Sequence, residues 1–162
     1  MPLNFNLRDL QKHELHLEGE LTAEELELTG VDELVRVIEP VTYEAVIELL
    51  SDSVLVQGQL HCTLACQCVR CLRPFNQEIE IADWTCNLPM EGEDKVAVIN
   101  DCIGLTAYVR EDILLAFPQH PLCEPGCRGL VKSDRNLNRS GSVERQANET
   151  ASAWAELNKL KF

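Results

Sequence analysis

The stretch Val54-Leu-Val-Gln-Gly-Gln-Leu-His-Cys-Thr-Leu-Ala-Cys-Gln-Cys68 decides the fold. Its apolar and cysteine side chains share one phase of a two-residue repeat: Val54, Val56, Leu60, Cys62, Leu64, Cys66 and Cys68. A period of two places alternate side chains on opposite faces of a β-strand. We therefore expect one long strand with a buried face. Cys62 and Cys66 are predicted to be small core residues on that face rather than metal ligands.

Shorter runs on both sides of this stretch alternate in the same way. They cover residues 12–18, 41–50 and 75–81, and a Ser51-Asp52-Ser53 turn separates the second run from the long one. Alternation with one polar face is typical of antiparallel strands joined by hairpins. Residues 87–95, which hold a proline, a glycine and three acids, predict an acidic loop.

A helix is predicted over residues 105–116. Leu105, Val109, Ile113 and Ala116 fall on one stripe of it, and Pro118 ends the pattern. The stripe is expected to pack on the sheet. The predicted fold is α+β, a mainly antiparallel β-sheet with one main helix packed on it, in a single domain over residues 1–127.

Residues 128–162 differ in composition and charge from the rest. The chain carries a formal net charge of -13, and residues 1–60, 61–127 and 128–162 contribute -10, -6 and +3. The last segment is predicted to be a flexible basic tail that ends in a short amphipathic piece at 154–160. An acidic body repels phosphate backbones, so charge-driven nucleic-acid binding by the body is disfavoured. Its acids form either a solvated surface or a platform for a basic protein partner.

The expected cellular compartment is inferred from two features that the sequence does not show. It has no apolar run approaching the roughly 18 residues that span a membrane, and its N-terminus does not have a charged-then-apolar signal. We expect a soluble protein of the cytoplasm, without a membrane or a small-molecule substrate as partner. In a reducing compartment, metal binding, redox chemistry or burial must explain the eight cysteines.

Two close cysteine pairs, Cys68/Cys71 and Cys123/Cys127, are the strongest chemical signal. Two such pairs supply the four sulfurs of a closed tetrahedral zinc site, so one structural zinc is predicted here. His120 is near enough in sequence to be a substitute ligand. Cys86 and Cys102 are isolated and predicted to be buried.

The alternative for Cys68 and Cys71 is a cytosolic dithiol redox site, in which Arg70 and Arg73 would lower a thiol pKa. Strand-like patterns flank this pair on both sides, whereas thioredoxin-like pairs open a helix. No phosphate-binding glycine loop, dinucleotide fingerprint or His-Glu-x-x-His helix occurs. We therefore predict no enzyme and no catalytic residue.

Four motifs in order resemble the YceD family, the large ribosomal RNA subunit accumulation proteins of bacteria and plastids. They are Cys68-Val-Arg-Cys-Leu-Arg-Pro-Phe75, Tyr108-Val-Arg-Glu-Asp-Ile-Leu-Leu-Ala-Phe-Pro118, Pro121-Leu-Cys-Glu-Pro-Gly-Cys-Arg-Gly-Leu130 and Asn136-Leu-Asn138. The closing Trp154-Ala-Glu-Leu-Asn-Lys-Leu160 is similar to the tail of cyanobacterial and plastid members.

The resemblance implies a non-enzymatic role in synthesis, processing or stability of 23S rRNA and in large-subunit assembly. The basic residues Arg128, Lys132, Arg135 and Arg139 are then candidate RNA contacts, and a solvated linker is the alternative. A basic ribosomal protein held by the acidic body is a second route, and a generic acidic protein-binding module is the competing class. Many relatives have a further Cys-x-x-Cys where this chain has Val131-Lys-Ser-Asp134. Zinc is lost if the family site uses those cysteines, and kept if it uses the two earlier pairs.

Overall fold

Five antiparallel strands form the main sheet of the computed structural model, which describes residues 3–130. Their bounds are β2 Leu15–Leu21, β3 Val35–Val37, β4 Val41–Leu49, β5 Ser53–Gln67 and β6 Pro74–Pro89. β5 is the central strand. It pairs with β6 along one edge, and along the other edge first with β4 and then with β3. The long alternating stretch of sequence thus forms the middle of the sheet.

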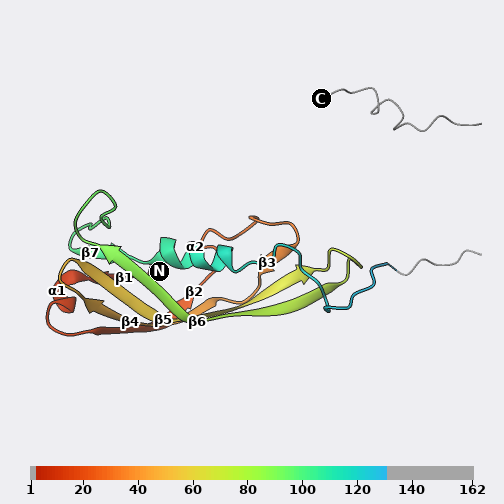
Figure 1. Cartoon of the computed structure of the whole chain (residues 1–162), viewed down its shortest axis with the longest axis horizontal. Coiled ribbons are helices and arrows are strands. Elements are labelled where there is room, and N and C mark those ends of the chain that lie inside the picture. Colours follow the sequence, from red (N-terminus) through yellow and green to blue (C-terminus); the bar gives the residue numbers. More distant parts are fainter. Residues whose placement is uncertain (1–2, 131–162) are drawn as a thin grey trace, which may run out of the picture. The chain divides into compact units, whose positions relative to one another are not determined.

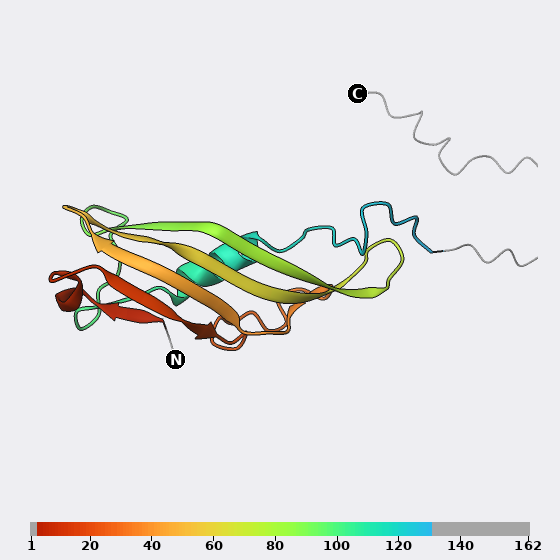
Figure 2. The same ribbon diagram turned by 90° about the horizontal axis from the view of Figure 1, so that it is seen from below.

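Smaller elements lie on one face of this sheet and at one of its ends, where α1 is found (Figures 1 and 2). They are the pair β1 (Asn4–Asn6) and β7 (Cys102–Gly104), the short helix α1 (Leu7–Leu10) and the helix α2 (Thr106–Leu115). The backbone amide of Leu105, just before α2, donates to the carbonyl of Leu3. This bond connects the start of α2 to the N-terminal segment.

The core fills the space between α2 and the sheet. Leu105, Val109 and Ile113 are fully buried, as the helical stripe predicts, and they share one hydrophobic cluster with the inward residues of β4 and β5. Burial of this apolar area is the main source of stability for a domain of this size. Cys62 and Cys66 are buried in the same cluster, which confirms their prediction as core residues.

A β-bulge changes the inward phase of β6 halfway along its length. Between Gly58 and Leu60 of β5, the partner strand β6 has one extra residue. Inward positions on β6 are therefore Ile79 and Ile81 before the bulge and Trp84 after it. The indole Nε1–H of Trp84 donates to Asp112 Oδ2 of α2 at 2.7 Å, which connects this half of the strand to the helix.

The fold class predicted from sequence is confirmed, with two differences. The expected acidic loop at 87–95 is wrong at its start, because β6 continues to Pro89 and buries Leu88. The strands β1, β3 and β7 were not predicted, because they have three residues each and offer no measurable alternation. Cys86 and Cys102 are half-buried, and Cys86 packs against the core.

Among residues 3–130, no helix is long and apolar enough to cross a membrane. The predicted tail, including Lys132, Arg135 and Arg139, lies outside the described residues apart from its first three positions. Its flexibility and the domain boundary at residue 127 stay predictions.

Candidate metal centre

The first cysteine pair lies on the turn that connects β5 to β6. The Cys68 amide donates to the Arg73 carbonyl at 2.9 Å, and the Leu72 amide donates to the Cys68 carbonyl at 2.9 Å. Leu72 has φ of 61°, in the left-handed region that L-residues adopt at a cost. This tight turn brings Cys71 back beside Cys68.

The second cysteine pair lies on the segment that follows α2, and this segment runs beside the β5–β6 turn in both views (Figures 1 and 2). The Val69 amide donates to the Pro121 carbonyl at 3.0 Å and joins the two segments. Within the second segment, the Cys127 amide donates to the Glu124 carbonyl at 3.1 Å. Backbone bonds therefore position both pairs independently of their sulfur atoms.

All four sulfur atoms lie within 4.8 Å of one another. The Cys68 and Cys127 Sγ atoms are 3.7 Å apart, and the Cys71 and Cys123 Sγ atoms are 3.6 Å apart. A tetrahedron of sulfurs around a zinc ion, with Zn–S near 2.3 Å, has edges of about 3.8 Å. The four cysteines, all free thiols, therefore fit a tetrahedral thiolate metal site.

Two arginines of the first turn bridge to the second segment. Arg70 Nη1 donates to the Cys127 carbonyl at 2.9 Å. Arg73 contacts sulfur from both pairs, with Nε 3.4 Å from Cys71 Sγ and Nη2 3.6 Å from Cys123 Sγ. From the sequence these arginines were predicted only to lower a thiol pKa, and their connection of the two segments was not predicted.

Glycine at position 129 permits this close packing. Gly129 has φ of 84°, and a Cβ there would lie 3.3 Å from the Arg70 carbonyl oxygen. A larger residue would face both backbone strain and a tight contact. A glycine two residues after a cysteine was the signal in the sequence that could have indicated this approach.

The protein environment lowers the pKa of two of these thiols and raises the pKa of a third. Hydrogen bonds from the backbone at Cys123 and Cys71 lower the pKa of Cys68 to about 6, and the Arg73 guanidinium lowers the pKa of Cys71. Burial, together with the neighbouring thiols, raises the pKa of Cys123 to about 12. Four thiolates this close repel one another, and a divalent cation supplies the charge that lets all of them ionise.

The site residues predicted from sequence have three outcomes. Cys68, Cys71, Cys123 and Cys127 come together as a possible metal site, although they lie on segments 51 residues apart in the chain. His120 is exposed and is not part of this set. Arg128 is exposed next to Cys127, whereas the other predicted RNA contacts are outside the described residues.

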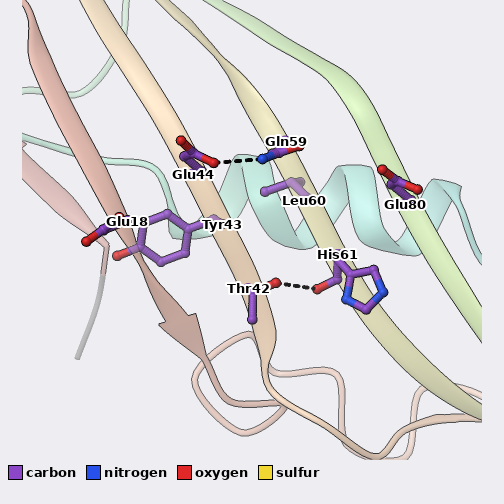
Figure 3. Close-up of a pocket in the computed structure, with 8 residues that line it drawn as sticks. All are labelled: Glu18, Thr42, Tyr43, Glu44, Gln59, Leu60, His61 and Glu80. Carbon is purple, nitrogen blue, oxygen red and sulfur yellow. Dashed lines mark hydrogen bonds between the residues drawn. The ribbon is translucent and has the colours of Figure 1, made fainter.

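The sheet face opposite α2 holds a shallow cavity of about 410 Å³ with acidic walls (Figure 3). Glu18 and Glu44 lie directly opposite each other on β2 and β4, and Glu80 lies opposite His61 on β6 and β5. Glu44 accepts a hydrogen bond of 2.7 Å from the Gln59 amide. Among residues 3–130, no lysine or arginine forms an ion pair with these three carboxylates. This face repels phosphate.

Comparison with known proteins gives a family and few relatives. Three mycobacterial proteins are 27% identical over 92 residues: uncharacterized protein Mb2951c of Mycobacterium bovis, and uncharacterized proteins MT2996 and Rv2926c of Mycobacterium tuberculosis. The match covers 52% of this chain but only 44% of each relative, so the chain spans less than half their length. No solved structure matches.

The model of one protein family matches residues 56–161, a range that includes most of β5, all of β6 and α2, and both cysteine pairs. This range is more than half of the chain and contains the four motifs on which the resemblance rests. The chain belongs to the YceD family, described as large ribosomal RNA subunit accumulation proteins.

Proposed function

We propose that this protein is a non-enzymatic factor of the cytoplasm that supports accumulation of 23S rRNA and assembly of the large ribosomal subunit. The observation that carries the proposal is the family match over residues 56–161. The architecture agrees with a binding role, because residues 3–130 form a sheet, a helix and a cysteine centre rather than a pocket with convergent catalytic groups.

One zinc ion at Cys68, Cys71, Cys123 and Cys127 would be structural in this proposal. The four thiols form a closed donor set, without room for the open coordination position that catalytic zinc needs. Cys68 and Cys127 are buried, yet neither belongs to the hydrophobic core cluster. A metal would therefore supply the cohesion that apolar packing does not supply at this end of the sheet.

RNA would contact the basic residues Arg128, Lys132, Arg135 and Arg139. The charge distribution supports this, because the last 35 residues are the net basic part of an otherwise acidic chain. Cationic side chains gain affinity for RNA by releasing counterions from the phosphates. The second route is a basic ribosomal protein bound by the acidic sheet face around Glu18 and Glu44.

A dithiol redox protein is the second candidate function. It is favoured by the low pKa of Cys68, about 6, which would give a thiolate at neutral pH. It is opposed by the complete burial of the same side chain, since thiol exchange needs access to the sulfur. Turnover of a dithiol reporter substrate, lost in Cys71→Ser while the sheet stays folded, would identify this function.

The test of the main proposal is depletion of the protein in its host. We expect the ratio of 23S to 16S rRNA and the amount of large subunits to fall, with 23S precursors altered. Re-expression of the wild-type chain should restore both. An unchanged ratio under full depletion would contradict the proposal.

Direct RNA contact is tested separately with a variant that replaces Lys132, Arg135 and Arg139 by Gln. Its binding to a 23S precursor fragment should be weaker and less salt-dependent than that of the wild type. Unchanged binding, together with retention of basic ribosomal proteins, would favour the protein-mediated route.

A further inference from the structure

Basic residues are concentrated in the two segments that carry the cysteine centre. Residues 3–130 contain 23 acids and eight bases. Three of these bases, Arg70, Arg73 and Arg128, belong to segments 68–73 and 121–130, which contain only one acid, Glu124. The net charge of these two segments is thus opposite in sign to that of the rest of the described chain.

Two of the three guanidinium groups have donors to spare. Arg70 uses Nη1 for the Cys127 carbonyl, which leaves most of its five N–H donors unused. Arg128 is exposed and has no hydrogen bond or ion pair within the described residues. Arg73 is different, because its N–H groups face the sulfurs of Cys71 and Cys123 and offset their charge.

A small cavity of about 230 Å³ lies beside Arg73. It is lined by Arg73, Pro74, Phe75, Cys123 and Glu124, so it combines a guanidinium, an aromatic ring and a carboxylate. Unpaired RNA bases stack on aromatic rings and on arginine planes, and carboxylates accept hydrogen bonds from base amino groups. Phe75 is half-buried, so part of its ring packs on the core while the rest faces the cavity.

Apolar side chains next to these arginines point into solvent. Leu72 is 53% exposed and Val69 is 39% exposed. Leu72 adopts a left-handed backbone conformation, and burial of its side chain does not offset the energetic cost of that conformation. An exposed apolar group next to arginines and an aromatic ring suits a partner with flat apolar faces as well as negative charge, which is the chemistry of a single-stranded RNA.

We propose that this end of the molecule, formed by Val69, Arg70, Leu72, Arg73, Phe75 and Arg128, binds an unpaired RNA segment. Arg70 and Arg128 contact its phosphates, and one base enters the cavity between Arg73 and Phe75. We call these six residues the turn surface. The inference rests on the proposed function and adds to it a second RNA contact, which shares only Arg128 with the basic tail.

The test uses the full-length chain and a fluorescein-labelled, unstructured RNA oligonucleotide, with anisotropy measured over a salt series. Arg70→Gln/Arg128→Gln should reduce the slope of log affinity against log salt by about 1.4, roughly 0.7 for each phosphate contact in a single strand. Phe75→Leu should weaken binding about fivefold or more without changing the slope, because it removes stacking and no charge.

Matched controls separate RNA contact from loss of structure. Arg36→Gln/Lys95→Gln removes the same charge from exposed positions outside the turn surface and should bind RNA like the wild type. Because Arg70 also holds the Cys127 carbonyl, metal content and circular dichroism are recorded for each variant. Arg128→Gln alone touches no cysteine contact and should still lower the slope by about 0.7.

The outcomes distinguish this inference from the proposed function. If Arg128→Gln and Phe75→Leu bind like the wild type while the Lys132/Arg135/Arg139 variant loses affinity, the turn surface is wrong and direct RNA contact stands. If the wild type binds no RNA, the turn surface and direct RNA contact through the tail both fail, and the protein-mediated route remains. If it binds a lysine- and arginine-rich peptide instead, the turn surface is again overturned, and the acidic face becomes the functional one.

Discussion

Different interactions stabilise the two ends of the long β5–β6 hairpin. Around Trp84, the hairpin packs against α2 through many fully buried apolar side chains. At Cys68, the chain turns outside that cluster, and four sulfurs and two arginines make the connections. Apolar cohesion is spread over many contacts and tolerates single losses. Stability at the cysteine end depends on a few groups, so loss of one group should destabilise that end strongly.

The largest expected effect is loss of the zinc ion that we propose at the four cysteines. Cys71→Ser, or treatment with a strong chelator, should release the ion and remove a binding free energy on the order of 10 kcal/mol. Because the core cluster is separate, we expect the sheet to survive. Amide exchange should accelerate at Cys68, whose N–H is bonded to Arg73, and remain slow at Val56 in the sheet.

Cys102→Ser is the matched control for this experiment, since Cys102 is half-buried and lies outside the sulfur set. It should keep full metal content. If Val56 and Cys68 both lose protection from amide exchange, the two ends form one cooperative unit. The claim that they are stabilised separately would then be wrong.

The next effect is at the opposite end. Ile113→Ala on α2 removes a fully buried side chain and should lower the free energy of unfolding by about 2–5 kcal/mol in urea denaturation. Metal content should not change, because the contact is in the core. Leu115→Ala, at a position 83% exposed on the same helix, should stay within about 0.5 kcal/mol of the wild type. Metal loss in Ile113→Ala would indicate coupling between the ends.

A smaller effect is expected from the polar contact within the apolar end. Trp84→Phe removes the donor to Asp112 and some buried volume, and should cost about 1–3 kcal/mol. Asp112→Asn keeps an acceptor oxygen for the indole and should cost less. An equal cost for both, measured by urea denaturation, would show that the charge of Asp112 and not the hydrogen bond matters.

The smallest effect is an alkaline loss of stability from the core thiols. Burial raises the pKa of Cys62 to about 11, and burial with nearby acids raises the pKa of Cys86 to about 11. An unfolded thiol titrates near 8.5, so the folded state holds more protons between these values. The free energy of unfolding should therefore fall as pH rises from about 9 to 11.

Cys62→Ala should flatten this decline, measured in the presence of excess zinc so that the cysteine centre does not contribute. A decline that persists unchanged in Cys62→Ala/Cys86→Ala would assign the alkaline sensitivity to other groups.

Periodicity in the sequence predicted the parts of the fold that repeat. β5 and α2 were predicted because burial of one face requires apolar residues at regular spacing over ten or more residues. The bulge on β6 was not predicted, since one extra residue shifts the apolar phase from Ile81 to Trp84 and makes the second half look like a separate segment. β3 was not predicted because three residues contain no period.

The candidate site, like the fold, was predicted only in part from the sequence. Spacing indicated the four cysteines, because two close pairs are a local feature of the chain. The bridges from Arg70 and Arg73 to the second segment were not visible, since they depend on which segments the fold places side by side. The close approach of Gly129 to Arg70 is a contact of the same kind.

The length of β5 has an electrostatic consequence. Gln59, opposite Glu44, precedes Cys68 by nine residues, and an extended strand covers about 30 Å in that distance. At physiological ionic strength the Debye length is about 8 Å, so the Glu44 carboxylate is nearly four screening lengths from the cysteine turn. An anionic polymer at the turn would hardly sense this carboxylate. In dilute buffer, where the Debye length is near 30 Å, the same carboxylate would oppose its approach.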